Sequence, residues 1–223
     1  MCKNFYLLNI VFILFLFTIV GCSDSIPDVV SSKSSVIFTY DDYESTPNVR
    51  LAVFLEVSSD PRRVETISIS SIKDNMKWLC EEPVVFSESN KKMVGYTNFV
   101  TPNDVKIPTG SYKVVYTDAQ GRFIESFTYV SYPEDLLESN ATESEEFLGL
   151  RKKEYIAIYN DKDEIIYFGD RKKHWTEDSI IFAGNKDYVK FRRCINMIDD
   201  SVICLFPFVT KESINNDIEK KAN

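Results

Sequence analysis

The sequence predicts a mainly β protein, built as an antiparallel sandwich or barrel. Aromatic residues are frequent, with 16 Phe and 12 Tyr in 223 residues, and aromatic and β-branched side chains favour strands. Several short runs alternate between apolar and polar residues, which is the period of a half-buried strand. Glycine, proline and acidic residues separate these runs at the spacing typical of all-β domains.

Residues 1–21 are predicted to be a secretory signal peptide and not part of the fold. Lys3 is the only charge before an almost wholly apolar run from Phe5 to Val20, and the small residue Gly21 follows it. A basic start, an apolar middle and a small residue before the cut are the three parts of such a signal. The alternative is an uncleaved transmembrane helix, which needs about 20 apolar residues, and this run is somewhat shorter.

The tetrapeptide Ile19-Val20-Gly21-Cys22 resembles the lipobox of bacterial lipoproteins. The resemblance implies cleavage between Gly21 and Cys22 and a diacylglycerol on the Cys22 thiol. Stable anchoring takes more than one acyl chain, and members of this family carry two or three. The implied location is the bacterial cell envelope, where Ser23 after the cysteine favours the outer membrane if two membranes are present.

A flexible tether is predicted over residues 22–34. This segment and the residue after it contain the run Ser31-Ser32-Lys33-Ser34-Ser35. Serine-rich linkers behave as flexible coils, so we expect the tether to hold the folded part a short distance from the bilayer.

The first folded unit is expected over residues 35–133. Its clearest strand is at residues 49–57, where every second residue is Val or Leu. Further strands are expected at residues 64–72, 82–88, 91–100, 111–118 and 122–130. A tight turn at Asp118–Gly121 joins the last two, with Gly121 able to take a positive φ.

The run from Pro108 to Val114 resembles the entry to the penultimate strand of immunoglobulin-like domains. Gly110 and Tyr112 match that motif, whereas Val114 stands where antibody domains have a core cysteine. The resemblance implies an immunoglobulin-like β-sandwich in which the Tyr112 ring is buried and its hydroxyl binds nearby backbone. The alternative is a sandwich of another topology. Trp78, the candidate inter-sheet aromatic, fits that role poorly by its position.

The second half is expected to be a smaller C-terminal β region over residues 151–210. An acidic connector with one or two helical turns, residues 134–150, precedes it, and a polar tail, residues 211–223, follows it. Residues 154–170 read as a β-hairpin with an acidic turn. A segment of about 60 residues is marginal as an independent domain, so we expect it to pack on the sandwich or to be held by a disulfide.

Three cysteines remain besides Cys22 and the signal residue Cys2. Cys194 and Cys204 flank the turn-like Asp199-Asp200-Ser201, and opposite positions of a hairpin bring Cβ atoms within about 5 Å. A Cys194–Cys204 disulfide with Cys80 free is therefore one expectation, and two buried thiols acting as small apolar residues is the other.

The charge of the chain excludes nucleic acid as a partner. Removal of the signal takes away Lys3 alone, so the net charge goes from −8 to −9, whereas nucleic-acid binding demands a basic face. Two basic triplets stand out, followed by an aromatic residue: Arg151, Lys152 and Lys153, then Arg171, Lys172 and Lys173, with Trp175 beyond them. If they meet at the open end of the hairpin, like charges opposite one another should attract counter-charge. Either the protein's own nearby glutamates supply it, or the triplets form an anionic-partner patch for phospholipid headgroups or an acidic protein, with Trp175 at its edge.

No motif for catalysis, a cofactor or a metal is present. His174 is the single histidine, and neither a G-x-S-x-G turn nor a phosphate-binding loop occurs. We therefore expect no enzyme, no cofactor and no metal site. The expected function is a lipid-anchored binding or structural module for protein–protein interaction in the envelope. The alternative is binding of glycan or peptidoglycan, and an envelope enzyme, which would need a pocket where carboxylates or His174 converge, is the weaker rival. Exposed aromatic rings on one sheet face would favour the glycan.

Overall fold

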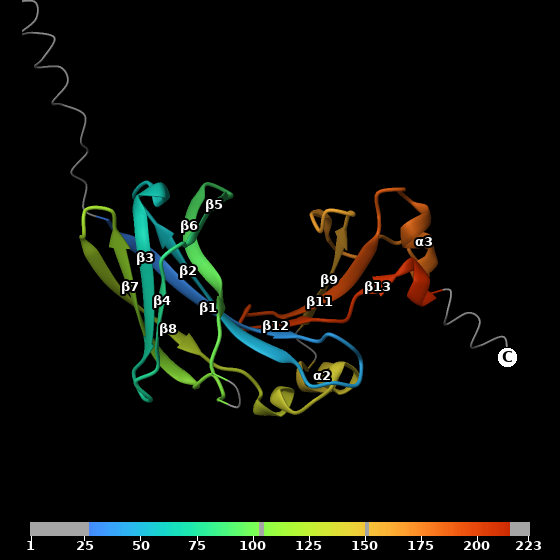
Figure 1. Cartoon of the computed structure of the whole chain (residues 1–223), viewed down its shortest axis with the longest axis horizontal. Helices are drawn as coiled ribbons and strands as arrows, with labels where there is room; N and C mark the ends of the chain where they lie inside the picture. The colour runs from blue at the N-terminus through green and yellow to red at the C-terminus, as the bar shows by residue number, and fades with distance from the viewer. Residues whose placement is uncertain (1–26, 103–104, 150–151, 215–223) are drawn as a thin grey trace, which may run out of the picture.

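The computed structural model describes residues 27–102, 105–149 and 152–214. Over these residues the protein is mainly β, as the sequence predicted, with two sheets that pack together. Figure 1 shows the two sheets facing each other in the N-terminal half, and the larger sheet curling away into the C-terminal half.

The larger sheet has nine strands and runs through both halves of the chain. Eight of them lie in the order β10-β9-β11-β12-β1-β2-β6-β5, and β13 pairs with β11. The strands are β1 (Val29–Thr39), β2 (Asn48–Val57), β5 (Val84–Glu88), β6 (Lys91–Phe99), β9 (Lys152–Tyr159), β10 (Ile165–Gly169), β11 (Lys190–Met197), β12 (Val202–Leu205) and β13 (Val209–Thr210).

The smaller sheet has four strands in the order β4-β3-β7-β8. They are β3 (Val64–Ser71), β4 (Lys77–Cys80), β7 (Gly110–Asp118) and β8 (Phe123–Val130). The helical elements are η1 (Pro61–Arg63), η2 (Glu134–Leu137), α2 (Ala141–Phe147) and α3 (Asp178–Ala183). The β7–β8 turn is the predicted one, and Gly121 has φ +75°.

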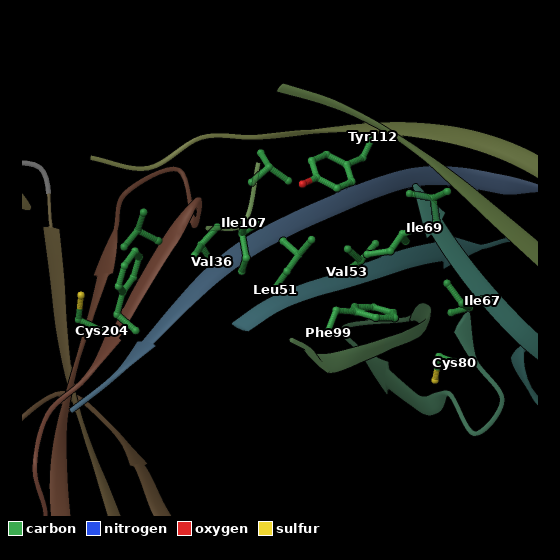
Figure 2. Close-up of a cluster of buried hydrophobic side chains, with 14 of the residues drawn as sticks. Val36, Leu51, Val53, Ile67, Ile69, Cys80, Phe99, Ile107, Tyr112 and Cys204 are labelled. Carbon is green, nitrogen blue, oxygen red and sulfur yellow. The ribbon is translucent and has the colours of Figure 1, made fainter. Parts of the chain in front are cut away.

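The main core lies between the two sheets, where the predicted period of two appears directly. Leu51, Val53 and Leu55 of β2 are fully buried. Figure 2 shows Leu51 and Val53 in one cluster with Ile67 and Ile69 of β3. The same cluster continues to Cys204 on β12. One contiguous core therefore extends from the sandwich into the C-terminal half.

Tyr112 occupies the position that the sequence predicted. Its ring is fully buried, and its hydroxyl donates a hydrogen bond of 2.7 Å to the carbonyl of Pro108. Burial raises the pKa of Tyr112 above its ordinary value, so the hydroxyl stays a donor at neutral pH. Trp78 stacks on the Tyr112 ring at 6.3 Å and meets Phe99 of the other sheet edge-on. Trp78 is half-buried on the edge strand β4 and not on β3, so it contacts aromatic rings of both sheets from the side of the sandwich.

We predict that Tyr112→Phe lowers the free energy of unfolding by about 1–2 kcal/mol, because the Pro108 carbonyl loses its donor. Urea denaturation measures this value. Tyr129→Phe is the matched control, since that side chain is 66% exposed. Equal stability of the two variants would show that the Tyr112 hydrogen bond contributes nothing.

The predicted flexible tether is wrong from Val29 onward, and residues 22–26 lie outside the described residues. Strand β1 begins at Val29 and pairs with β2 along its whole length. Its serines bind the neighbouring strand β8: Ser32 and Ser34 donate to the carbonyls of Phe127 and Tyr129. The serine-rich composition therefore reflects the closure of the sandwich by hydroxyl groups and not a coil.

The C-terminal region is joined to the sandwich through one sheet. β12 pairs in parallel with the second half of β1, with Val36 opposite Val202 and Thr39 opposite Leu205. The connector adds a second attachment, since it contains η2 and α2 as expected, and Leu136 and Ala141 are buried in the main core. The sheet and the main core both continue across residue 150, so this residue is not a natural boundary between two domains.

Ion pairs fasten α2 to the C-terminal strands. Arg193 of β11 binds Glu145 of α2 and Glu154 of β9, each at 2.8 Å, and Lys152 lies 3.6 Å from Glu145. Burial alone would raise the pKa of Glu145, but hydrogen bonding and charge from Arg193 and Lys152 lower it below its ordinary value. This carboxylate therefore stays ionised well below neutral pH and holds the connector against β9 and β11.

The predicted disulfide between Cys194 and Cys204 is wrong. The β11–β12 hairpin forms as expected, but Cys194 lies opposite Leu205, and Cys204 lies opposite Ile195. Successive side chains of a strand point to opposite faces of the sheet, so the two thiols lie on opposite faces. Both are buried and free, as is Cys80, which matches the alternative of thiols acting as small apolar residues.

We predict that none of these three thiols reacts in the folded protein that lacks residues 1–21 and carries Cys22→Ser. Burial raises the pKa of Cys194 to about 11 and that of Cys204 to about 12 from an ordinary 9.0. At pH 8 a pKa of about 11 lowers the reactive thiolate fraction roughly 100-fold. The pKa values of both thiols are higher in the folded state than in the unfolded chain. Their contribution to the free energy of unfolding is therefore complete below about pH 9 and is lost as the pH rises towards about 12.

A thiol-reactive dye should label the three cysteines in urea only. Mass spectrometry of unreduced peptides provides the second reading, and a peptide pair joined through Cys194 and Cys204 would contradict the strand register given above.

Candidate binding surface

Strand β8 places its aromatic residues on the wrong face for a simple sandwich. Phe123, Phe127 and Tyr129 point outward and are 64%, 59% and 66% exposed. On the inner face, Ser126 and Thr128 alternate with them and hydrogen-bond to hydroxyls of β1. A sandwich strand normally has its apolar face inside and its polar face outside. We call these three outward residues the aromatic row. Their exposure costs free energy because it leaves large apolar side chains in water, and such a cluster on a surface indicates a functional site.

The surroundings of the aromatic row are polar. Across β7, Ser111, Lys113 and Thr117 lie opposite Tyr129, Phe127 and Phe123 in register. Between the rings, Glu125 forms an ion pair of 3.0 Å with Lys113. Val115, opposite Glu125, is the apolar residue of β7 on this face. Elsewhere along β7 charged and hydroxyl groups border the aromatic row, so the apolar surface is narrow.

A small polar pocket lies at the Tyr129 end of the row. Its volume is about 280 Å³, and it lies where β8, β1 and the β11–β12 turn meet. We call it the junction pocket; its wall includes Lys33, Ser35, Tyr129, Ser131, Asp199 and Asp200. Ser35 donates a hydrogen bond of 2.6 Å to the Asp200 carbonyl, which fixes the turn against β1.

The two aspartates of the junction pocket supply hydrogen-bond acceptors. Asp199 accepts from the backbone N–H and the hydroxyl of Ser201 at 3.1 and 2.8 Å, and these bonds hold the pKa of Asp199 below its ordinary value. Asp200 has φ +58°, and its side chain is exposed at the rim. An ionised carboxylate is an acceptor only, so this end of the pocket suits a ligand rich in donors.

The basic triplets are placed differently from the sequence expectation. Arg151 lies outside the described residues, and Lys152 is paired with Glu145. The β9–β10 ladder ends where Gly169 meets Ile156, so Arg171, Lys172 and Lys173 follow in a loop outside the sheet. The ladder therefore ends before the two triplets meet, and among the described residues no ladder pair joins them.

The second triplet is engaged within its own loop. Arg171 forms an ion pair of 3.0 Å with Asp178, and the Lys172 ammonium lies 4.9 and 4.8 Å from the ring centres of Tyr167 and Trp175. Trp175 is 3% exposed and belongs to a second core beneath α3, so it does not form the edge of a surface patch. Lys153 and Lys173 are exposed, but these single charges do not make a site.

Sequence reasoning found β8 as a strand and missed its orientation. Apolar residues occur at both odd and even positions of the strand, with Ile124 and Val130 on the inner side. The signal that could have shown the orientation is the match between Ser126 and Thr128 on β8 and the serines of residues 31–35, which need one another as partners.

No protein-family model, no curated protein and no solved structure matches the chain. Over the described residues, no group of three or more His, Cys, Asp or Glu side chains is arranged to hold a metal ion. The helices in the same residues are all too short or too polar to cross a membrane.

Proposed function

We propose that the protein is a lipid-anchored binding module of the bacterial cell envelope, with the aromatic row as its recognition surface. The single observation that carries the binding role is the outward aromatic face of β8, which is exposed while hydroxyl groups fill the inner side. Partner-binding sites are where large exposed apolar side chains are expected to gather.

The lipid anchor is supported by the sequence Ile19-Val20-Gly21-Cys22 and by how soon the fold begins after it. Strand β1 starts at Val29, and the residues between Cys22 and Val29 span at most about 25 Å when fully extended. An acylated Cys22 would therefore hold the sandwich close to the bilayer. Where two membranes exist, the outer one is the proposed location.

We further propose that the sandwich is immunoglobulin-like. With β1, β2, β3, β5, β6, β7 and β8 taken as strands A to G, the two sheets have the orders A-B-E-D and C-F-G, with β4 beside C. These orders are those of constant-type immunoglobulin domains. The hydrogen bond from Tyr112 at the start of β7 to Pro108 supports the same assignment.

Two partner classes fit a binding module, an envelope protein or a glycan. Protein interfaces bury about 800 Å² on each partner and have an apolar centre, whereas the aromatic row is one strand wide within polar surroundings. This shape favours the glycan over the protein, and it supports recognition over catalysis.

We predict that Cys22→Ala abolishes lipid labelling. Cells expressing the wild-type chain should incorporate labelled fatty acid into the protein and cut it before Cys22, because the thiol is the site of acylation. The variant should accumulate as an unlabelled precursor. Continued labelling of Cys22→Ala would overturn the anchor.

We predict that a photo-crosslinking residue at position 127 captures an envelope component, and that the same residue at position 168 does not. Phe127 and Phe168 are 59% and 58% exposed on edge strands of different sheets, so they are matched in accessibility. Equal yields at the two positions, or none at either, would contradict the assignment of the β8 face as the recognition surface.

A further inference from the structure

We propose that the aromatic row and the junction pocket together bind a linear glycan of uncharged sugar units. The inference rests on the proposed function only in its use of the β8 face, and it names the chemical class of the partner. A sugar ring offers an apolar C–H face and a rim of hydroxyl groups, so its binding site needs exposed aromatic rings beside hydrogen-bonding side chains. Both are present on this surface.

The spacing of the row fits an extended polymer. Residues two apart on the same face of a strand are about 7 Å apart, and the six steps from Phe123 to Tyr129 cover about 20 Å. The rings thus form a narrow line that ends at the junction pocket, since Tyr129 belongs to both. A chain of sugar units can lie along this line and place its terminal unit in the junction pocket.

An extended peptide is the competing linear ligand, and the edge of β8 disfavours it. A peptide that adds to a sheet needs free backbone groups on the edge strand. The carbonyls of Phe127 and Tyr129 on this edge already accept hydrogen bonds from the Ser32 and Ser34 hydroxyls. A peptide would have to displace β1, whereas a glycan needs only the outward side chains.

The charged side chains of this surface determine which glycans can bind. The junction pocket contains the carboxylates of Asp199 and Asp200 against the single ammonium of Lys33, and Glu125 lies within the row. The mature chain is also acidic as a whole. Polyanionic glycans are therefore repelled, while sugar hydroxyls and amides find acceptors in the carboxylates and serines.

The test is calorimetric titration of the mature chain carrying Cys22→Ser with two probes, the linear hexasaccharides of β-linked glucose and of β-linked N-acetylglucosamine. We expect at least one to bind. Phe127→Ala and Tyr129→Ala should each weaken that binding about tenfold or more, a change of about 1.4 kcal/mol. Asp200→Asn keeps a residue that tolerates positive φ and should weaken it several-fold.

The matched control is Phe168→Ala, which removes an equally exposed ring from β10 and should leave binding unchanged. Heparin, a polyanion, should not bind. Three results would each overturn the inference. They are failure of both hexasaccharides to bind, a loss of affinity in Phe168→Ala equal to that in Phe127→Ala, and binding of heparin that is tighter than binding of the hexasaccharides. A chain that is acylated at Cys22 and crosslinks to a protein through position 127 would support the proposed function and still refute the glycan.

Discussion

The whole architecture depends on β1 having partners on both sides. It pairs antiparallel with β2 along its length and in parallel with β12 over residues 36–39. Because an edge strand carries unpaired N–H and C=O groups, β1 without β12 would leave such groups open beside the main core. With β12 in place, the nine strands make one sheet, and the N-terminal and C-terminal halves share one core (Figure 1).

Polar groups secure the same junction where apolar packing ends. Arg192 of β11 is almost fully buried, and its guanidinium donates to the Phe206 carbonyl at 2.8 Å while lying 4.3 Å from the Phe208 ring. A buried charge is tolerated only when hydrogen-bonded, so Arg192 holds the chain in place as it leaves β12. On the opposite face of the sheet, Arg193 and Glu145 do the same for the connector. Both arginines thus bind segments that are distant from β11 in sequence or that leave the sheet beside it.

Prediction from the sequence succeeded for strands that have one buried face and one solvent-exposed face. The alternation over residues 49–57 and the turn at Gly121 were predictable because local pattern and tertiary packing agree there, and the burial of Tyr112 followed from the resemblance of residues 108–114 to a known strand entry. It failed where tertiary partners override local pattern. The serines of β1 have the composition of a flexible coil, but they form a strand because β8 supplies acceptors for their hydroxyls. The two C-terminal cysteines flank a turn, but the register of the hairpin places them on opposite faces of the sheet.

The candidate surface was not predictable in the same way. Its aromatic residues belong to a strand that the sequence identified, yet their exposure depends on which face of β8 meets β1. Only the pairing of Ser126 and Thr128 with Ser32 and Ser34 decides that, and these contacts join residues more than ninety positions apart. The basic triplets, in contrast, stand out by composition, and two of their residues, Arg171 and Lys152, pair with the nearby acids Asp178 and Glu145.

The closure of the sheet by β12 also has a consequence for how the chain acquires its fold. Ser35 and Asp200, which hydrogen-bond at this junction, are 165 residues apart in sequence, and contacts between distant residues slow folding because a long loop must first be ordered. The N-terminus is synthesised first, so the side of β1 that pairs with β12 is an open edge until nearly all of the chain is available. During that interval the strand can pair with other chains. A chain cut short before residue 202 lacks β12 and keeps this edge of β1 open.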